Sequence, residues 1–138
     1  MVGASDKSMA LDTAPVILGV VEIDADHLKI ADLLDALLGS QIDNADAAFS
    51  LIHLSKLVDA MCEHFVREEE IMRSAKYCCF NEHKHEHDTF LQTLSTLLNN
   101  NETHNSQITG DTIGMIRDWK FEHIQTHDKP LANFILGK

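Results

Sequence analysis

Histidines lie in line with the apolar residues of four segments of this chain, at positions that a folded protein buries. His83 and His87 are four residues apart, and on an α-helix this spacing puts both imidazoles on one face, one turn apart. His64 and Glu68 repeat the spacing, whereas Glu69 is expected on a wetter face. A histidine on an apolar face is more often a hydrogen-bonded core residue than a metal ligand. A glutamate in a core, however, has to be neutralised, paired or bound to metal.

The apolar spacing predicts an all-α chain. Residues such as Ile30, Leu34 and Leu37 recur with the period of an amphipathic helix. The sequence has only two prolines and six glycines, and its 6% of aromatic residues fits helices filled with leucine and alanine better than a β-sheet. The asparagines at 99–101 are expected to end the third helix. We expect four helices, over residues 24–38, 45–74, 81–98 and 109–127.

Short connections between these helices favour an up-down-up-down antiparallel four-helix bundle. We expect one domain over residues 17–138, behind a flexible N-terminal lead of residues 1–16. Asp24 or Asp26 is expected to cap the start of the first helix, and Gly39 to end it.

Two further histidines, His27 and His123, also lie on apolar stripes, so a bundle would direct them into the core, where metal sites are built from facing helices. Asp128 follows His123 by five residues, which on a regular helix turns it about 140° away from that histidine. Asp128 can share a site with His123 only through side-chain reach, a local distortion, or the end of the helix. Pro130 favours the last two.

The composition excludes some partners. A formal charge of −11 repels nucleic acid and anionic membranes, so neither is expected. No apolar run approaches the roughly 20 residues that span a bilayer, and no signal peptide is evident. Three cysteines without regular spacing argue for a reducing compartment, which we take to be cytoplasmic. The adjacent Cys78 and Cys79 are either packed or loop thiols, or a redox switch.

Four groups of residues carry a resemblance to a known family. They are Ile23-Asp24-x-x-His27, His64-Phe65-x-x-Glu68-Glu69-x-x-Met72, Tyr77 followed by His83-Lys84-x-Glu86-His87-x-x-Phe90, and Trp119-x-x-x-His123-x-x-x-x-Asp128. In order and spacing they resemble bacterial hemerythrin domains from Gly19 to Asp128. All seven positions that bind iron in that family hold matching residue types here. One departure concerns the residue after Tyr77, which is often proline in the family and is Cys78 here.

The resemblance implies a non-heme site of two iron ions (Fe2+/Fe3+) joined by a bridging oxo or hydroxo group. One iron would be held by His83, His87 and His123, and the other by His27 and His64 alone. Glu68 and Asp128 would bridge both. The second iron is then five-coordinate, and its vacant position is where O2 would bind.

The function that follows is reversible O2 binding, as an O2-binding or O2- and redox-sensing domain that is not an enzyme. One alternative is the sensory module of a longer signalling protein, whose iron state controls an output domain or a partner protein. A di-iron oxidase, or an enzyme that handles peroxide or nitric oxide, is a further alternative. The candidates for an apolar wall around the open iron, or for ordinary core packing, are Leu34, Phe65, Phe90 and Trp119. His127, beside Asp128, is a possible substitute ligand.

Overall fold

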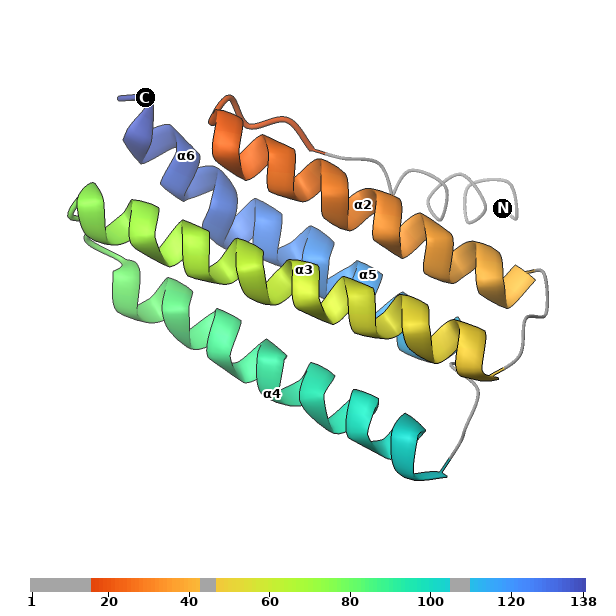
Figure 1. The fold of residues 1–138 in the computed structure, drawn as a ribbon. Coiled ribbons are helices and arrows are strands. Elements are labelled where there is room, and N and C mark those ends of the chain that lie inside the picture. The colour runs from red at the N-terminus through yellow and green to blue at the C-terminus, as the bar shows by residue number, and fades with distance from the viewer. Residues whose placement is uncertain (1–15, 43–46, 105–109) are drawn as a thin grey trace, which may run out of the picture.

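The computed structural model describes residues 16–42, 47–104 and 110–138. Four long rods lie side by side and alternate in direction, which confirms the up-down-up-down antiparallel four-helix bundle (Figure 1). The fourth rod is continuous through three elements, and no strand occurs in the described part of the chain. The elements are α2 (Val21–Ile42), α3 (Ala47–Ser74), α4 (Phe80–His104), α5 (Gly110–His123), the π-helix η1 (Ile124–Asp128) and α6 (Lys129–Ile135).

The first helix is longer than predicted at both ends. It continues through Gly39 to Ile42, so the predicted stop at Gly39 is wrong. Asp24 lies inside the first turn and not at the cap, and its carboxylate accepts hydrogen bonds from the backbone N–H groups of Leu18 and Gly19 at 2.8 and 3.0 Å. Asp24 therefore fixes the segment that leads into the helix, where its charge also complements the helix dipole.

The third helix, α4, is also longer than predicted, because it continues through the asparagines at 99–101 to His104. Asparagine costs an α-helix only a fraction of a kcal/mol per residue, so this run does not stop it. The predicted flexible lead, residues 1–16, falls on residues outside the described ones, apart from Val16. No described helix is both long and apolar enough to cross a membrane.

Two apolar clusters fill the bundle, one on each side of a layer of buried polar residues. The smaller cluster holds Val20, Ile23, Met72, Leu131 and Ala132. The burial of Leu131 and Ala132 confirms that the tail packs back on the bundle. The larger cluster lies along the other half of the helices, on the opposite side of the polar layer. Its fully buried members include Leu34, Leu37, Leu54, Leu57, Leu94 and Ile113. On every helix the predicted site residues fall between the two clusters, so apolar packing holds them on both sides.

Candidate metal centre

The structure brings all seven predicted site residues together in this polar layer. Helices α2, α3 and α4 contribute one, two and two residues, and the fourth rod, formed by α5, η1 and α6, contributes the last two. Each of these residues is at most 4% exposed, and polar groups buried this deeply need partners of opposite character. The residues are His27 from α2, His64 and Glu68 from α3, His83 and His87 from α4, His123 from the end of α5 and Asp128 from the end of η1.

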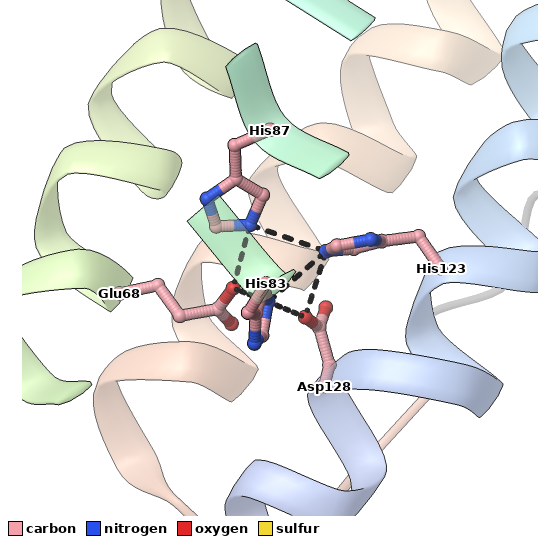
Figure 2. A group of neighbouring side chains, drawn as sticks. All are labelled: Glu68, His83, His87, His123 and Asp128. Atoms are coloured by element: carbon pink, nitrogen blue, oxygen red, sulfur yellow. Dashed lines mark hydrogen bonds and ion pairs between the residues drawn. The ribbon is translucent and has the colours of Figure 1, made fainter. Parts of the chain in front are cut away.

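These side chains form two overlapping groups that can each hold a cation. The first combines Glu68 and Asp128 with three histidines, His83, His87 and His123, and the second combines the same two carboxylates with His27 and His64. Within each group the ligand atoms lie within 4.8 Å of one another. Figure 2 shows the first group, with Glu68 and Asp128 entering from opposite sides of the three rings. The two acids are therefore common to both groups, and the histidines divide three against two.

All five histidines turn the same ring atom, Nε2, toward the shared carboxylates. His83 Nε2 lies 2.8 Å from Glu68 Oε1, and His27 Nε2 lies 2.9 Å from Asp128 Oδ2. His123 Nε2 lies 3.2 Å from the Nε2 atoms of both His83 and His87. Two nitrogens that bind one ion at about 2.1 Å and at right angles to each other lie about 3 Å apart. The spacing of the three rings therefore fits neighbouring positions around one metal ion.

Glu68 gives a second test of fit. Its oxygens lie 2.8–3.5 Å from histidine nitrogens, yet among the described residues neither oxygen has a hydrogen bond of acceptable geometry. The same holds for Nε2 of His64. Buried polar atoms without hydrogen bonds are rare in native proteins, and a cation between them is an ordinary explanation. The donor set, five imidazoles and two carboxylates, suits a transition metal such as iron.

Asp128 reaches the site through a local distortion, one of the alternatives that the sequence left open. Residues Ile124–Asp128 form a π-helix, in which the N–H of Lys129 donates to the carbonyl of Ile124 five residues earlier. A π-turn places residues five apart on one side, so His123 and Asp128 face the same centre. The helix does not end at Pro130, which lies in the first turn of α6, where a missing N–H is tolerated.

Two carboxylates outside the predicted set of seven orient two of the histidines. Nδ1 of His64 donates to Asp26 at 3.0 Å, and Nδ1 of His87 donates to Glu69 at 2.9 Å. Glu69 is 8% exposed, so its prediction on a wetter face is wrong. Such contacts fix which ring nitrogen is left for a metal and raise the basicity of the ligand. The sequence signal was weak, because Glu69 reaches His87 only once α4 packs against α3.

The electrostatics of the site favour positive charge next to its two carboxylates. Burial alone would lower the pKa of His83, but its contacts with Asp128 and Glu68 raise that pKa to about 9. Burial alone would raise the pKa of Asp128, but the surrounding His123, His27 and His83 hold it well below its usual range. The carboxylates therefore stay ionised and draw either protons or a metal cation to the histidines.

Aromatic rings cover the three-histidine group. Phe65 stacks on His87 with ring centroids 4.0 Å apart, and Trp119 stacks on His123 at 4.4 Å. Phe90 in turn stacks on Trp119 at 3.8 Å. Of the four candidates for an apolar wall around the open iron, Phe65 and Trp119 contact histidines of the site, Phe90 contacts only Trp119 among these rings, and Leu34 lies in the larger apolar cluster.

A small cavity of about 10 Å³ lies against the two-histidine group, and about one water-sized molecule fits in it. Its lining includes both histidines of this group, His27 and His64. Of the three histidines in the other group, it includes only His123. The sequence identified Phe65 and Trp119 in this lining and missed its other members, Ile30, Met61, Lys120 and Ile124. These residues touch one another only in the folded bundle.

His127 does not join either group. It is partly buried, and its Nε2 lies 3.6 Å from Glu86 Oε1, on the outer side of His123. Asp128, and not its neighbour, therefore lies with the two carboxylate-sharing groups, whereas His127 forms a separate, less buried cluster with Glu86 and His123.

The fold and the site together define a four-helix bundle with a buried, histidine-rich and carboxylate-sharing cation site. Comparison with known proteins agrees: residues 18–135 match the family model of the hemerythrin HHE cation-binding domain, and the chain belongs to this family.

Relatives come from animals and bacteria. The chain is 34% identical to a hemerythrin of Themiste dyscrita over 106 residues, which cover 77% of this chain and 76% of that protein. It is 28% identical to a bacteriohemerythrin of Stenotrophomonas maltophilia over 116 residues, or 84% of this chain and 74% of that one. A crystal structure of wild-type hemerythrin superposes with a TM-score of 0.79 at 27% identity, covering 83% and 88% of the two chains.

Proposed function

We propose that this chain is a non-heme di-iron protein that binds O2 reversibly and is not an enzyme. The observation that carries the proposal is the unequal division of the histidines around two shared carboxylates. His83, His87 and His123 would hold one iron, His27 and His64 the other, and Glu68 and Asp128 would bridge them together with a solvent-derived oxo or hydroxo group. Its relatives are named hemerythrins and bacteriohemerythrins, which supports this assignment.

The unequal division leaves one iron a ligand short, and the cavity lies on that side. When bound, two ferrous ions supply the electrons that hold O2, and its release returns them. The chain's own part is to orient the imidazoles through Asp26 and Glu69, and to exclude water with apolar side chains such as Met61 and Phe65. Exclusion of water protects the ferrous state from side reactions.

The size of the cavity favours a diatomic ligand over a larger substrate. A space of about 10 Å³ has no room for an organic molecule, which an oxidase would have to place beside the metal. This observation supports O2 binding over the enzymatic alternative. The free cysteines of the described chain support a reducing compartment such as the cytoplasm.

The test is the metal content and optical spectrum of freshly reduced protein, before and after exposure to air. We expect about two irons per chain, one for each of the two overlapping groups of side chains. We also expect an absorption change on adding O2 that reverses when O2 is removed under argon. Sustained O2 consumption with a reductant would identify an enzyme instead, and a single iron per chain would contradict the proposed centre.

A further inference from the structure

The turn between α3 and α4 carries two thiols that the metal centre does not use. Cys78 and Cys79 are adjacent and exposed, and their sulfur atoms lie 3.5 Å apart. The third cysteine, Cys62, is partly buried on α3 and packs against the larger apolar cluster. The two exposed sulfurs already face each other, and a disulfide bond requires them to approach to about 2.05 Å.

The turn is held firmly on its α3 side. Lys76 has a left-handed backbone with φ of 54°, and the N–H of Tyr77 donates to the carbonyl of Met72 at 3.0 Å. The ring of Tyr77 packs against Phe134 of the fourth rod, with centroids 5.1 Å apart. Movement of Tyr77 therefore cannot accommodate a conformational change at the two cysteines. Such a change instead displaces the residues that follow them, at the start of α4.

On its other side the turn leads directly into the helix that carries two histidines of the metal centre. The N–H of His83 donates to the carbonyl of Cys79 at 3.1 Å, so Cys79 belongs to the hydrogen bonding of the first turn of α4. His83 is one of the three histidines around the shared carboxylates. The carbonyl of Cys79, in the peptide that directly follows the two thiols, is thus one hydrogen bond away from a residue of the centre.

We propose that Cys78 and Cys79 form a reversible redox modification site, in which hydrogen peroxide closes the pair to a vicinal disulfide that loosens the first turn of α4. The two sulfurs lie within reach of each other, both are open to solvent, and the turn connects them rigidly to the metal centre. The inference concerns the thiols themselves and holds whether or not the centre binds O2.

The chemistry balances with peroxide as the sole oxidant. One thiolate attacks a peroxide oxygen, the O–O bond breaks, and a sulfenic acid and water form after proton transfer. The neighbouring thiol sulfur then attacks the sulfenic sulfur, the S–O bond breaks, and a second water leaves as the S–S bond forms. The two sulfurs together lose two electrons and peroxide gains two. A dithiol reductant reverses the modification by thiol–disulfide exchange.

A disulfide at this place is expected to be easily reduced. Adjacent Cα atoms are about 3.8 Å apart, whereas disulfide-bonded cysteines usually have Cα atoms at least about 4.4 Å apart. A ring closed across one peptide is therefore strained, and strained, exposed disulfides are the labile ones. The hydrogen bond with Cys78 raises the pKa of Cys79, which favours the protonated thiol at this position.

The experiment treats the full chain, loaded with iron as isolated, with hydrogen peroxide and then with dithiothreitol. Mass spectrometry after alkylation should show that the peptide with Cys78 and Cys79 loses two hydrogen atoms, while Cys62 remains alkylated. Amide hydrogen exchange at the start of α4, including His83, should rise about tenfold and return after reduction. Neither readout depends on O2 binding.

Two matched variants separate the thiol pair from oxidation of the iron. Cys62→Ser should respond to peroxide as the unaltered chain does. Cys79→Ser should show no peroxide-dependent change in exchange at α4, because no ring can close. The proposal is overturned by sulfinic acid or intermolecular disulfides as the main products. It is equally overturned by a rise in α4 exchange of the same size in Cys79→Ser.

Discussion

The three-histidine side and the two-histidine side of the centre share their carboxylates and differ in what surrounds them. On the first, aromatic rings stack directly on His87 and His123 at 4.0 and 4.4 Å, so the imidazoles are closed in. On the second, His27 and His64 meet edge to face at 5.0 Å, and a cavity opens beside them. The same bundle thus builds one filled side and one side with space for a small molecule.

The difference shows how a nearly symmetric bundle produces an asymmetric site. The number of ligands alone would leave a position for solvent as readily as for O2. In the proposed centre the packing would favour O2, because Ile30 and Met61 make the wall of the cavity apolar. A substitution on one side, or in the carboxylates that the two sides share, should therefore show how far metal binding and O2 binding on the other side depend on it.

Removing a shared carboxylate should have the largest effect. Asp128→Ala takes an acid from both groups and removes the carboxylate that contacts His27, His83 and His123. We expect loss of nearly all iron from the purified protein, measured by elemental analysis. Asp88→Ala is the control, since Asp88 is an exposed acid on α4 that pairs with Lys84. Retention of about two irons in Asp128→Ala would show that the acid is not a bridge.

Removing one histidine should separate the two sides. His27→Ala takes a ligand from the two-histidine group only, so we expect about one iron per chain to remain on the intact three-histidine group. His87→Ala should lose the iron of its own group. His85→Ala, an exposed histidine on the same helix as His87, should keep both. Equal iron loss from His87→Ala and His85→Ala would refute the ligand assignment.

Filling the cavity should slow ligand entry without removing metal. Ile30→Phe adds bulk to the cavity wall, and we expect O2 association, followed by stopped-flow absorbance, to slow about tenfold or more, with overpacking that costs about 1–3 kcal/mol. Leu37→Phe is matched, because Leu37 is fully buried on the same helix but outside the cavity lining. It should lose similar stability and keep the rate. Equal rates in both variants would place the entry of O2 elsewhere.

The sequence predicted the bundle and the convergence of the seven side chains because helical period and ligand spacing are local properties. Helix ends were less predictable. Gly39 and the asparagines at 99–101 are weak breakers, and tertiary packing carries the helices past them. Asp128 shows the limit most clearly: a regular helix turns it away, and only the π-turn that begins at Ile124 brings it back.

The residues that orient the histidines could not be predicted for a different reason. Asp26 and Glu69 each contact a histidine on another helix, 38 and 18 residues away in the sequence. Which exposed-looking acid faces which ring depends on how the helices rotate against each other. That rotation is set by packing of the whole bundle, which a single helix period does not specify.

The smallest loss of stability is expected from Asp26→Asn, on the outer edge of the two-histidine side. Burial alone would raise the pKa of Asp26, but hydrogen bonds from His64 and Arg67 lower it to about 2 from an ordinary 3.8. A lowered folded-state pKa stabilises the chain above pH 3.8, and this contribution disappears as the pH falls toward 2. Because solvent screens a partly open group, we expect Asp26→Asn to lower the free energy of unfolding by about 1 kcal/mol at neutral pH.

Urea unfolding of the metal-free chain and of Asp26→Asn measures this difference at about pH 7 and about pH 3.5, where it should be smaller. Asp35→Asn, an exposed acid on the same helix, controls for the loss of one negative charge. In iron-loaded protein, Asp26→Asn should also weaken metal binding about 10–100-fold, because His64 loses the carboxylate that orients its ring. A stability difference that stays constant with pH would mean that Asp26 acts through packing and not through its charge.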